Sequence, residues 1–405
     1  MPGRAVSSIR FCTNPLKDNP MFDNADSSRM KRDLADLVAI RSENPPGNEK
    51  EAASFVGARL RDIGLEVAFD EYRPGRINVE ARLANGPGPV FAFNTHMDTV
   101  PAGDGWSGDP FALRSRDGRL YGRGACDCKG PLASMLEAIR MLAAVRDGWS
   151  GTLLAIFVAD EEIASEGAKH FAAKGPKIDF AVVGEPTSNT IYSAHKGSLR
   201  PVVRVHGIAA HSGTPHLGEN AILRAGQLLG MVAEEHETTV RRRTHPLVGE
   251  ASLTVTRIGG GHADNVLPEQ CDLLLDRRMV PGEDEGAVKE ELAALLDRAR
   301  QRFGLRAEIV DWKATTGAAT ETAADRPIVR RSLDVARRLG ISEPGPFGFQ
   351  GGCDLVHFRA TGAEGVVIGP GSLSVAHKPD EFVPEDEFVL SSLVYRDVAH
   401  AMFAS

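Results

Sequence analysis

The segment at residues 152–159 most constrains how this chain can fold, because it is short, almost entirely apolar and followed directly by three acids. Its sequence, TLLAIFVA, is typical of a central strand that is covered on both faces. Residues 180–183 have the same character, and helical patterns separate such strands along the chain. Strands that alternate with helices predict an α/β fold with a mostly parallel sheet.

Hydrophobic periodicity predicts the remaining elements. Apolar residues at spacings of three and four favour helices at 28–40, 49–63, 131–142 and 327–339, and shorter runs favour strands at 65–69, 78–83, 90–94 and 365–368. From about residue 195 the pattern changes to strands at 200–205 and 252–258 and helices at 220–235 and 286–303. This pattern predicts a smaller α+β unit inserted in the chain.

The chain therefore divides into four segments. Its length of 405 residues exceeds the size at which one hydrophobic core stops growing, so we expect two domains. The main domain should comprise residues 28–196 and 312–405, and the inserted domain residues 197–311. Residues 1–27 are rich in Pro, Asn, Asp and Ser and lack periodicity, which is typical of a flexible arm.

Composition argues against several classes of protein. A net charge of −8 argues against binding to nucleic acid or to an anionic membrane, because both carry negative charge. The basic cluster Arg241-Arg242-Arg243 is typical of a solvated surface. No run reaches transmembrane length, and the first thirty residues lack the apolar stretch of a signal peptide. Five cysteines, an odd number without regular spacing, favour a reducing cytoplasm.

A His-x-Asp pair ends the strand expected at 90–94. Side chains two residues apart on a strand point to the same side, so Asp98 can accept the second N–H of His96 and make the imidazole a better metal ligand. Alone, this pair is more often structural. The next motif, Gly122-Arg123-Gly124-Ala125-Cys126-Asp127, offers a tight loop that can present the carboxylate of Asp127, although a capping aspartate is equally consistent with it.

Three further acidic or histidine positions follow predicted strands. Glu161 and Glu162 stand directly after the apolar run, where one acid can bind a metal while its neighbour reaches the water that the metal activates. A solvated acidic loop at the start of a helix is the alternative for this pair. Glu185 follows the strand at 180–183, and His377 lies in a turn beyond a glycine-rich segment. We expect all of these residues to lie at the edge of the sheet formed by the carboxyl ends of its strands, where open α/β sheets bind ligands.

In this order the motifs resemble the two-zinc hydrolases that include acetylornithine deacetylase, succinyl-diaminopimelate desuccinylase, aminoacylase and bacterial glutamate carboxypeptidase. The resemblance covers roughly residues 30–395. It implies a zinc-exopeptidase-like catalytic domain and a ferredoxin-like inserted domain that serves as a lid and forms a homodimer. It also implies a cytoplasmic enzyme that cuts an amide-type C–N bond in a small substrate.

The resemblance assigns the metal ligands residue by residue. One zinc would be held by His96, Asp127 and Glu185, and the other by Asp127, Glu162 and His377, so that Asp127 bridges them. Oxygen and nitrogen donors suit catalytic zinc, and a shared anion offsets the repulsion between two cations. Cobalt or manganese could replace zinc at such sites. None of the cysteines has a role in this scheme.

The resemblance also assigns catalytic and substrate-binding residues. Glu161 would be the general base, and His211 would help to stabilise the oxyanion, often from the partner subunit. Arg278 would bind a substrate carboxylate, with Asn265 and Gly352 as further contacts. We interpret the neighbouring Arg277 as a surface or strand residue.

Departures from the family pattern leave the substrate open. Cys128 and Pro131 stand where many relatives carry methionine and glycine, and Gly352-Cys353-Asp354 differs from the commonest form of a substrate-facing loop. The favoured substrates are N-acyl amino acids or dipeptides. Alternatives are another C–N bond, such as an N-carbamoyl or arylamine group, or a non-catalytic homologue that only binds metal or ligand.

Overall fold

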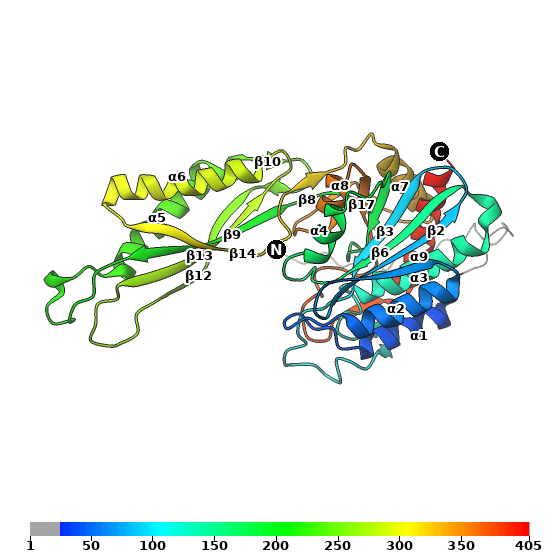
Figure 1. Cartoon of the computed structure of the whole chain (residues 1–405), viewed down its shortest axis with the longest axis horizontal. Coiled ribbons are helices and arrows are strands. Elements are labelled where there is room, and N and C mark those ends of the chain that lie inside the picture. Colours follow the sequence, from blue (N-terminus) through cyan, green and yellow to red (C-terminus); the bar gives the residue numbers. More distant parts are fainter. Residues whose placement is uncertain (1–24, 405) are drawn as a thin grey trace, which may run out of the picture.

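A computed structural model describes residues 25–404, so nearly all of the arm expected at 1–27 lies outside the described residues. The described part forms a larger unit and an elongated smaller unit that extends from one side of it (Figure 1). Within residues 25–404, no helix combines the length and apolar character that crossing a bilayer requires.

The larger unit is built on a nine-stranded sheet whose four central strands are parallel. In spatial order these central strands are β6 (Gly151–Val158), β3 (Val90–His96), β7 (Phe180–Val183) and β17 (Glu364–Val367). Antiparallel strands flank them, with β2 (Arg76–Asn85) and β1 (Glu66–Arg73) beyond β6, and β8 (Tyr192–His195) and β15 (Thr320–Glu321) beyond β17. The ninth strand, β16 (Phe347–Phe349), pairs with β8. The expected mostly parallel α/β sheet is confirmed at its centre.

Helices cover both faces of this sheet, as the apolar strands require. Strand β3 illustrates the reason, because Phe91 and Phe93 pack into one hydrophobic cluster while Ala92 packs into another on the opposite face. The first cluster includes helices α1 (Ser27–Ala39), α2 (Lys50–Ile63), α3 (Lys129–Ala144), α7 (Pro327–Arg338) and α9 (Glu385–Phe403). The second includes α4 (Glu166–Ala173) and α8 (Leu355–Ala360). A small sheet of β4 (Arg114–Arg116), β5 (Arg119–Tyr121) and β18 (Phe382–Pro384) borders the unit.

The smaller unit has the ferredoxin-like arrangement. Its chain order is β9 (Gly197–His206), α5 (Ala221–Thr238), β12 (Ser252–Gly260), β13 (Gln270–Met279), α6 (Glu285–Phe303) and β14 (Ala307–Lys313). The four strands form an antiparallel sheet in the order β12-β13-β9-β14, and the two helices pack into one core with it. A short hairpin of β10 (Thr244–His245) and β11 (Gly249–Glu250) lies between α5 and β12.

Two features of the smaller unit were not expected. Strand β13 lies in the middle of its sheet, although its many charged residues suggested only a substrate motif. On this strand Arg277 is 1% exposed and pairs with Glu283, so it is a buried strand residue and not a surface one.

The second feature is how the chain enters and leaves the smaller unit. The chain enters the unit after β8 and returns to β15, and His195 of β8 pairs directly with Thr320 of β15. The two connections therefore lie side by side.

Candidate metal centre and pocket

The carboxyl ends of three parallel strands bring the predicted ligands together. His96 is the last residue of β3 and is paired with Val158, the last residue of β6. Glu162 lies four residues after β6 ends, and Glu185 lies two residues after β7 ends. Because parallel strands end at the same edge of a sheet, these side chains converge although they are far apart in sequence.

Asp127 lies between the two histidines. Its Oδ1 is 3.2 Å from Nε2 of His96, and its Oδ2 is 3.2 Å from Nε2 of His377. The loop that carries Asp127 is anchored by Glu381, whose Oε1 accepts the backbone N–H groups of Cys126 and Asp127 at 2.9 and 3.0 Å. Glu381 in turn pairs with the buried guanidinium of Arg123. This anchoring fixes the direction of the Asp127 carboxylate.

His377 approaches the site from a strained turn. Its backbone is left-handed, with φ of 62°, which costs a residue other than glycine about 1 kcal/mol. Its Nε2 lies 3.0 Å from Oε2 of Glu162, and its side chain is 51% exposed. Such backbone conformations gather at functional sites, where the surrounding structure maintains them.

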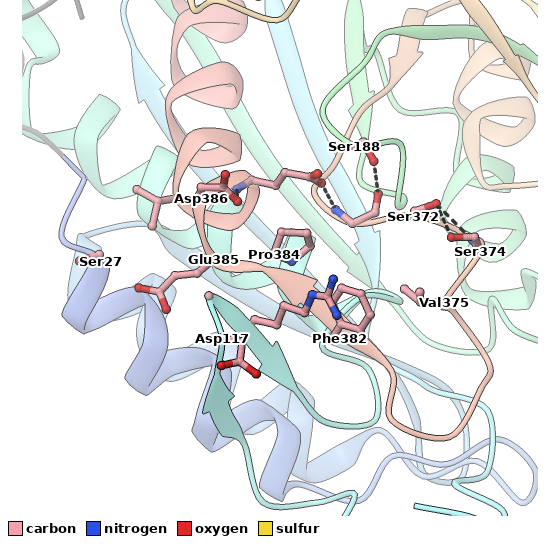
Figure 2. Close-up of a pocket in the computed structure, with 15 residues that line it drawn as sticks. Ser27, Asp117, Ser188, Ser372, Ser374, Val375, Phe382, Pro384, Glu385 and Asp386 are labelled. Atoms are coloured by element: carbon pink, nitrogen blue, oxygen red, sulfur yellow. Dashed lines mark hydrogen bonds between the residues drawn. The ribbon is translucent and has the colours of Figure 1, made fainter. Parts of the chain in front are cut away.

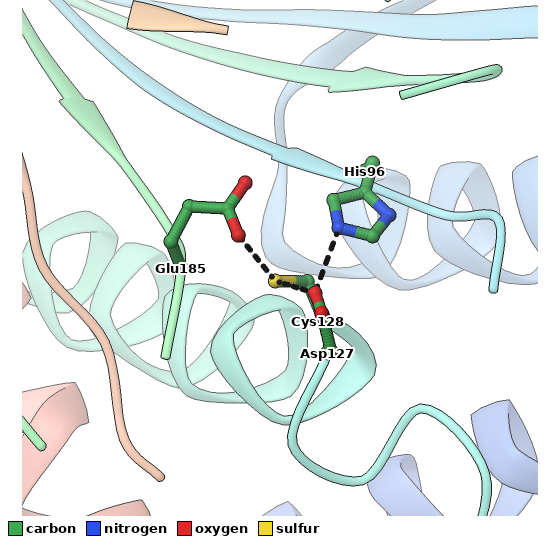
Figure 3. Close-up of side chains that lie close together, drawn as sticks. All are labelled: His96, Asp127, Cys128 and Glu185. Atoms are coloured by element: carbon green, nitrogen blue, oxygen red, sulfur yellow. Dashed lines mark hydrogen bonds and ion pairs between the residues drawn. The ribbon is translucent and has the colours of Figure 1, made fainter. Parts of the chain in front are cut away.

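These side chains form two groups that could each hold a metal ion, with Asp127 common to both. In the first group, Asp127 is joined by His96, Cys128 and Glu185 (Figure 3). In the second group it is joined by Glu162 and His377. Within each group the ligand atoms lie within 4.8 Å of one another. The five predicted ligands thus occur in the predicted partition, and Cys128 is an addition to it.

The electrostatics of the site fit bound cations. Burial raises the pKa of Glu161, Glu162 and Glu185, and neighbouring carboxylates raise these values further. Hydrogen bonds to Asp127 and Glu162 raise the pKa of His377 to about 10. Without metal, protons on these groups must therefore compensate a buried cluster of acids. Divalent cations among the same nitrogen and oxygen atoms would do so directly, and those atoms are suitable zinc ligands.

Asp98 is tied to the site more extensively than the His-x-Asp motif suggested. Its Oδ1 accepts the backbone N–H of Glu161 at 3.1 Å, and its Oδ2 accepts that of Glu162 at 3.2 Å. Asn44 also donates to Oδ2 at 2.8 Å. Nδ1 of His96 lies 2.9 Å from the backbone oxygen of Asp98 and 3.5 Å from its Oδ1. The residue thus orients the imidazole mainly through its carbonyl, while its carboxylate holds the acidic turn.

A pocket of about 200 Å³ opens beside the two metal groups. The pocket is lined by Asp127, Glu161, Glu162, Glu185 and His377, and also by Gly352, for which we predicted a substrate contact. The predicted Arg278 lines it from the smaller unit, together with Arg200. The pocket is therefore lined from both units, with residues of the metal groups from the larger unit and two arginines from the smaller one.

Arg200 and Arg278 share a single counter-ion. Nε of Arg200 donates to Oδ2 of Asp276 at 2.9 Å, and Nε of Arg278 donates to Oδ1 of the same carboxylate at 2.7 Å. Two guanidinium groups and one carboxylate leave one net positive charge at the pocket wall. This arrangement suits an anionic group of a ligand.

His211 and Asn265 are not among the residues that line this pocket. They lie in two neighbouring loops, where the backbone N–H of Ser212 donates to the carbonyl of Asn265. These loops extend from the far end of the second sheet, because β9 ends at His206, eight residues from the pocket residue Ser198. That separation along the strand is about 26 Å at the usual rise per residue. A single chain therefore does not bring these two residues to its own pocket.

A larger hollow of about 950 Å³ lies elsewhere on the surface (Figure 2). It is lined by serines, by Phe382 and Pro384, and by acidic residues that include Asp117, Glu385 and Asp386. None of the predicted metal ligands lines it, and no histidine or cysteine does. The chemistry-bearing groups thus mark the smaller pocket as the candidate site.

Comparison with known proteins places the chain in a family. The family model described as peptidase family M20/M25/M40 matches residues 92–401, well over half of the sequence. The chain belongs to this family. It is accordingly an enzyme, a metal-dependent hydrolase of amide-type C–N bonds.

Individual relatives agree with this M20/M25/M40 membership. A probable succinyl-diaminopimelate desuccinylase of Staphylococcus epidermidis is 29% identical, with 91% of this chain and 96% of the relative covered. An acetylornithine deacetylase of Vibrio vulnificus is 32% identical, with 88% and 93% covered. The crystal structure of an M20 family metallo-carboxypeptidase from Sulfolobus solfataricus has the same fold, with a TM-score of 0.78 at 18% identity over 93% of this chain and 99% of that one.

Three residues of this M20/M25/M40 enzyme were not assigned a role from sequence. Arg200 carried no signal, because an arginine on a strand is ordinarily a solvated residue. Glu381 stands four positions after His377, and only the fold shows that it anchors the Asp127 loop. Cys128 was set aside, yet its Sγ lies 3.0 Å from Oδ1 of Asp127. Its place directly after Asp127, the predicted bridging ligand, was the available signal.

Proposed function

We propose that the chain hydrolyses an amide bond in a small substrate that bears a carboxylate, as an N-acyl amino acid deacylase or a dipeptidase-like enzyme. The observation that carries this proposal is the pocket itself, which residues of both metal groups line together with Arg278 and Arg200. A substrate that spans the pocket would place its amide carbonyl near the metal groups and its carboxylate near the guanidinium groups. A free amino acid would be one product.

We assign zinc to both metal groups, with cobalt or manganese as substitutes. His96, Asp127 and Glu185 hold the first ion in this assignment, and Asp127, Glu162 and His377 hold the second. When bound, the two ions supply an activated water and polarise the carbonyl that it attacks. Asp127 fixes the separation of the two groups, because its two oxygens face different histidines.

Glu161 is assigned as the general base. Its carboxylate lines the pocket beside the metal groups, and its backbone is held by Asp98. In the proposed reaction Glu161 accepts a proton from the attacking water and returns it to the leaving nitrogen. Burial and the neighbouring carboxylate of Glu185 raise the pKa of its carboxyl group above the usual range.

Arg278 is assigned to the substrate carboxylate, and Arg200 assists it. Both side chains are held by Asp276, which fixes their direction and leaves one unit of positive charge uncompensated. Gly352 lines the same pocket and leaves room for the substrate there. A guanidinium group that binds a carboxylate in a fixed orientation also sets where the amide bond lies.

His211 and Asn265 are assigned to the site of a partner subunit. They lie at the far end of the smaller unit, where apolar side chains are exposed: Ile208 by 51%, Leu217 by 67% and Leu223 by 72%. Strand β12 is an unpaired sheet edge in the same unit. A homodimer formed through this unit would cover the apolar side chains and the edge, and would deliver His211 to stabilise the oxyanion.

The proposal includes the division of the chain. Residues 28–196 and 312–405 form the catalytic domain, and residues 197–311 form the lid and dimerisation domain. We place the enzyme in the cytoplasm, where its buried thiols remain reduced; those described are Cys126, Cys128, Cys271 and Cys353.

A panel of substrates tests the function. Zinc-loaded protein is assayed with N-acetyl, N-succinyl and N-carbamoyl amino acids, dipeptides and arylamides, each with and without the free carboxylate. We expect turnover of N-acyl amino acids or dipeptides, and a loss of kcat/KM when the carboxylate is amidated. Preference for N-carbamoyl substrates or arylamides would support the alternative bond types. Absence of turnover with two ions bound would support a binding protein.

A further inference from the structure

We infer that Cys128 is a fourth ligand of the first metal group, which then holds its ion through one nitrogen, two oxygens and one sulfur. The inference rests on the metal-binding part of the proposed function. It extends that proposal to the choice of metal and to a difference in role between the two ions.

The sulfur of Cys128 lies among ligand atoms. Its Sγ is 3.0 Å from Oδ1 of Asp127 and 3.4 Å from Oε2 of Glu185, and the imidazole of His96 faces the same space (Figure 3). A thiol has one proton and can donate it to only one of the two oxygens at a time. A cation placed among these atoms contacts both oxygens, the nitrogen and the sulfur at once.

The other cysteines within residues 25–404 lie outside the metal groups. Buried cysteines usually pack as small apolar side chains, and Cys126, Cys271 and Cys353 are buried without belonging to either metal group. Cys271 and Cys353 each pack within a hydrophobic cluster. Cys126 and Cys128 belong to none of the three clusters described for residues 25–404. The thiol of Cys126 donates to the backbone carbonyl of Ser372 at 3.5 Å, whereas Cys128 alone among the described cysteines has its sulfur among candidate metal ligands.

With Cys128 included, the two groups become unequal. The first group has four protein donors, all from buried residues. The second has three, and one of them belongs to the half-exposed His377, which lines the pocket. Four protein ligands complete the tetrahedral shell of zinc, whereas three leave a position open, as in catalytic sites. On this inference the open position belongs to the second group, whose Glu162 and His377 both line the pocket.

A sulfur ligand also selects among metals. Thiolate is a soft donor that favours zinc, whereas manganese and magnesium favour oxygen donors. On binding, a sulfur–metal bond forms and the thiol proton is released to solvent. The first group should therefore discriminate strongly against manganese, and the second group, which has only oxygen and nitrogen donors, should discriminate less.

Cobalt spectroscopy tests the inference. The purified full-length chain is loaded with two equivalents of Co²⁺, and bound cobalt is counted by elemental analysis. Thiolate ligation gives an intense near-ultraviolet charge-transfer band that nitrogen and oxygen ligands do not give. We expect this band in the wild type and its loss in Cys128→Ser. Cys126→Ser is the matched control, because it removes a buried thiol two residues away in the same loop, and it should keep the band.

A metal-affinity measurement accompanies the spectra. In competition with a chelator, Cys128→Ser should bind one of its two ions at least about tenfold more weakly, since even partners outside the ligand shell contribute that much. Its affinity for the other ion should change little. Equal affinities in wild type and variant would contradict the inference.

The outcomes separate this inference from the proposed function. Two bound cobalt ions with amide turnover but no charge-transfer band would overturn the role of Cys128 and leave the function standing. A band that persists in Cys128→Ser would also overturn it. Failure of the wild type to bind cobalt would overturn both. The wild-type spectrum is decisive by itself, so the test does not depend on the stability of the variant.

Discussion

The backbone N–H of Glu161 donates a 3.1 Å hydrogen bond to the carboxylate of Asp98. The second oxygen of that carboxylate accepts the N–H of Glu162. Asp98→Asn would leave one acceptor oxygen for three donors, the N–H groups of Glu161 and Glu162 and the amide of Asn44, and so release the acidic turn. We expect kcat to fall about 10- to 100-fold together with a loss of metal affinity, as is usual for groups that orient ligands. Steady-state kinetics and metal analysis check this, and unchanged values for both would contradict it.

Glu161→Gln should nearly abolish turnover while both ions stay bound. The amide keeps the size of the side chain but cannot accept a proton, so we expect kcat to fall about 10²- to 10⁴-fold. Glu162→Gln is the contrasting variant, because Glu162 belongs to the second metal group and its loss should lower the metal content. Normal turnover by Glu161→Gln would remove it from the role of base.

Arg278→Ala and Arg200→Ala should each raise KM for carboxylate substrates. A hydrogen bond to a charged group contributes about 1.5 to 3 kcal/mol, which corresponds to about a 10- to 100-fold change. The same variants should have little effect on amidated substrates. Arg204→Ala is a matched control, because Arg204 pairs with Asp272 on the same two strands but does not line the pocket. Equal effects on both substrate types would contradict the assignment.

His211→Ala and Glu161→Gln should complement each other in mixed dimers. Each homodimer lacks an essential group in both sites, whereas a hybrid has one site with Glu161 from one chain and His211 from the other. After full subunit exchange of equal amounts, we expect about a quarter of wild-type activity. Native mass spectrometry confirms that hybrids have formed. Hybrids without activity, or a fully active His211→Ala, would contradict delivery of His211 from the partner.

Acid should destabilise the fold in part through His195. Burial lowers the pKa of this histidine to about 4, whereas the unfolded residue titrates near 6.5. Between these values the unfolded chain binds a proton that the folded chain does not, so the free energy of unfolding falls as pH falls. From pH 7 to pH 5 this residue contributes a loss of about 2 kcal/mol.

Urea unfolding at both pH values measures this loss. His195→Asn should lose less stability than the wild type between pH 7 and pH 5, since it removes the titrating group and leaves every other acid-sensitive group in place. The two proteins have to be compared at the same metal loading. Parallel losses in both would contradict the role of His195.

The convergence of the candidate metal ligands could be predicted because most of them follow strands that the sequence marks clearly. His96, Glu162 and Glu185 come after short apolar runs, and parallel runs of this kind end at one edge of a sheet. His377 and Asp127 lie in loops and were placed by resemblance alone. Their convergence depends on the anchoring of the Asp127 loop by Glu381, a contact between residues far apart in sequence.

Other features depend on pairing between distant segments, which periodicity does not report. Strand β13 is central in its sheet, but four charged residues interrupt its apolar pattern, and two of them, Asp276 and Arg277, are buried by pairing that the sequence does not show. Arg200 becomes part of the pocket because β9 and β13 place it against Asp276. The separation of His211 from the pocket follows from the length of β9. We predicted a strand at 200–205, whereas β9 begins earlier, at Gly197.

The pairing of His195 with Thr320 means that the smaller unit is an insertion at the tip of a two-stranded hairpin. A short turn could join these strands without shifting the register of the main sheet. In the proposed function, bond cleavage belongs to the larger unit, and recognition of the substrate carboxylate depends on residues of the inserted unit. Substitutions in the inserted part can therefore change substrate specificity while the residues proposed for hydrolysis stay the same.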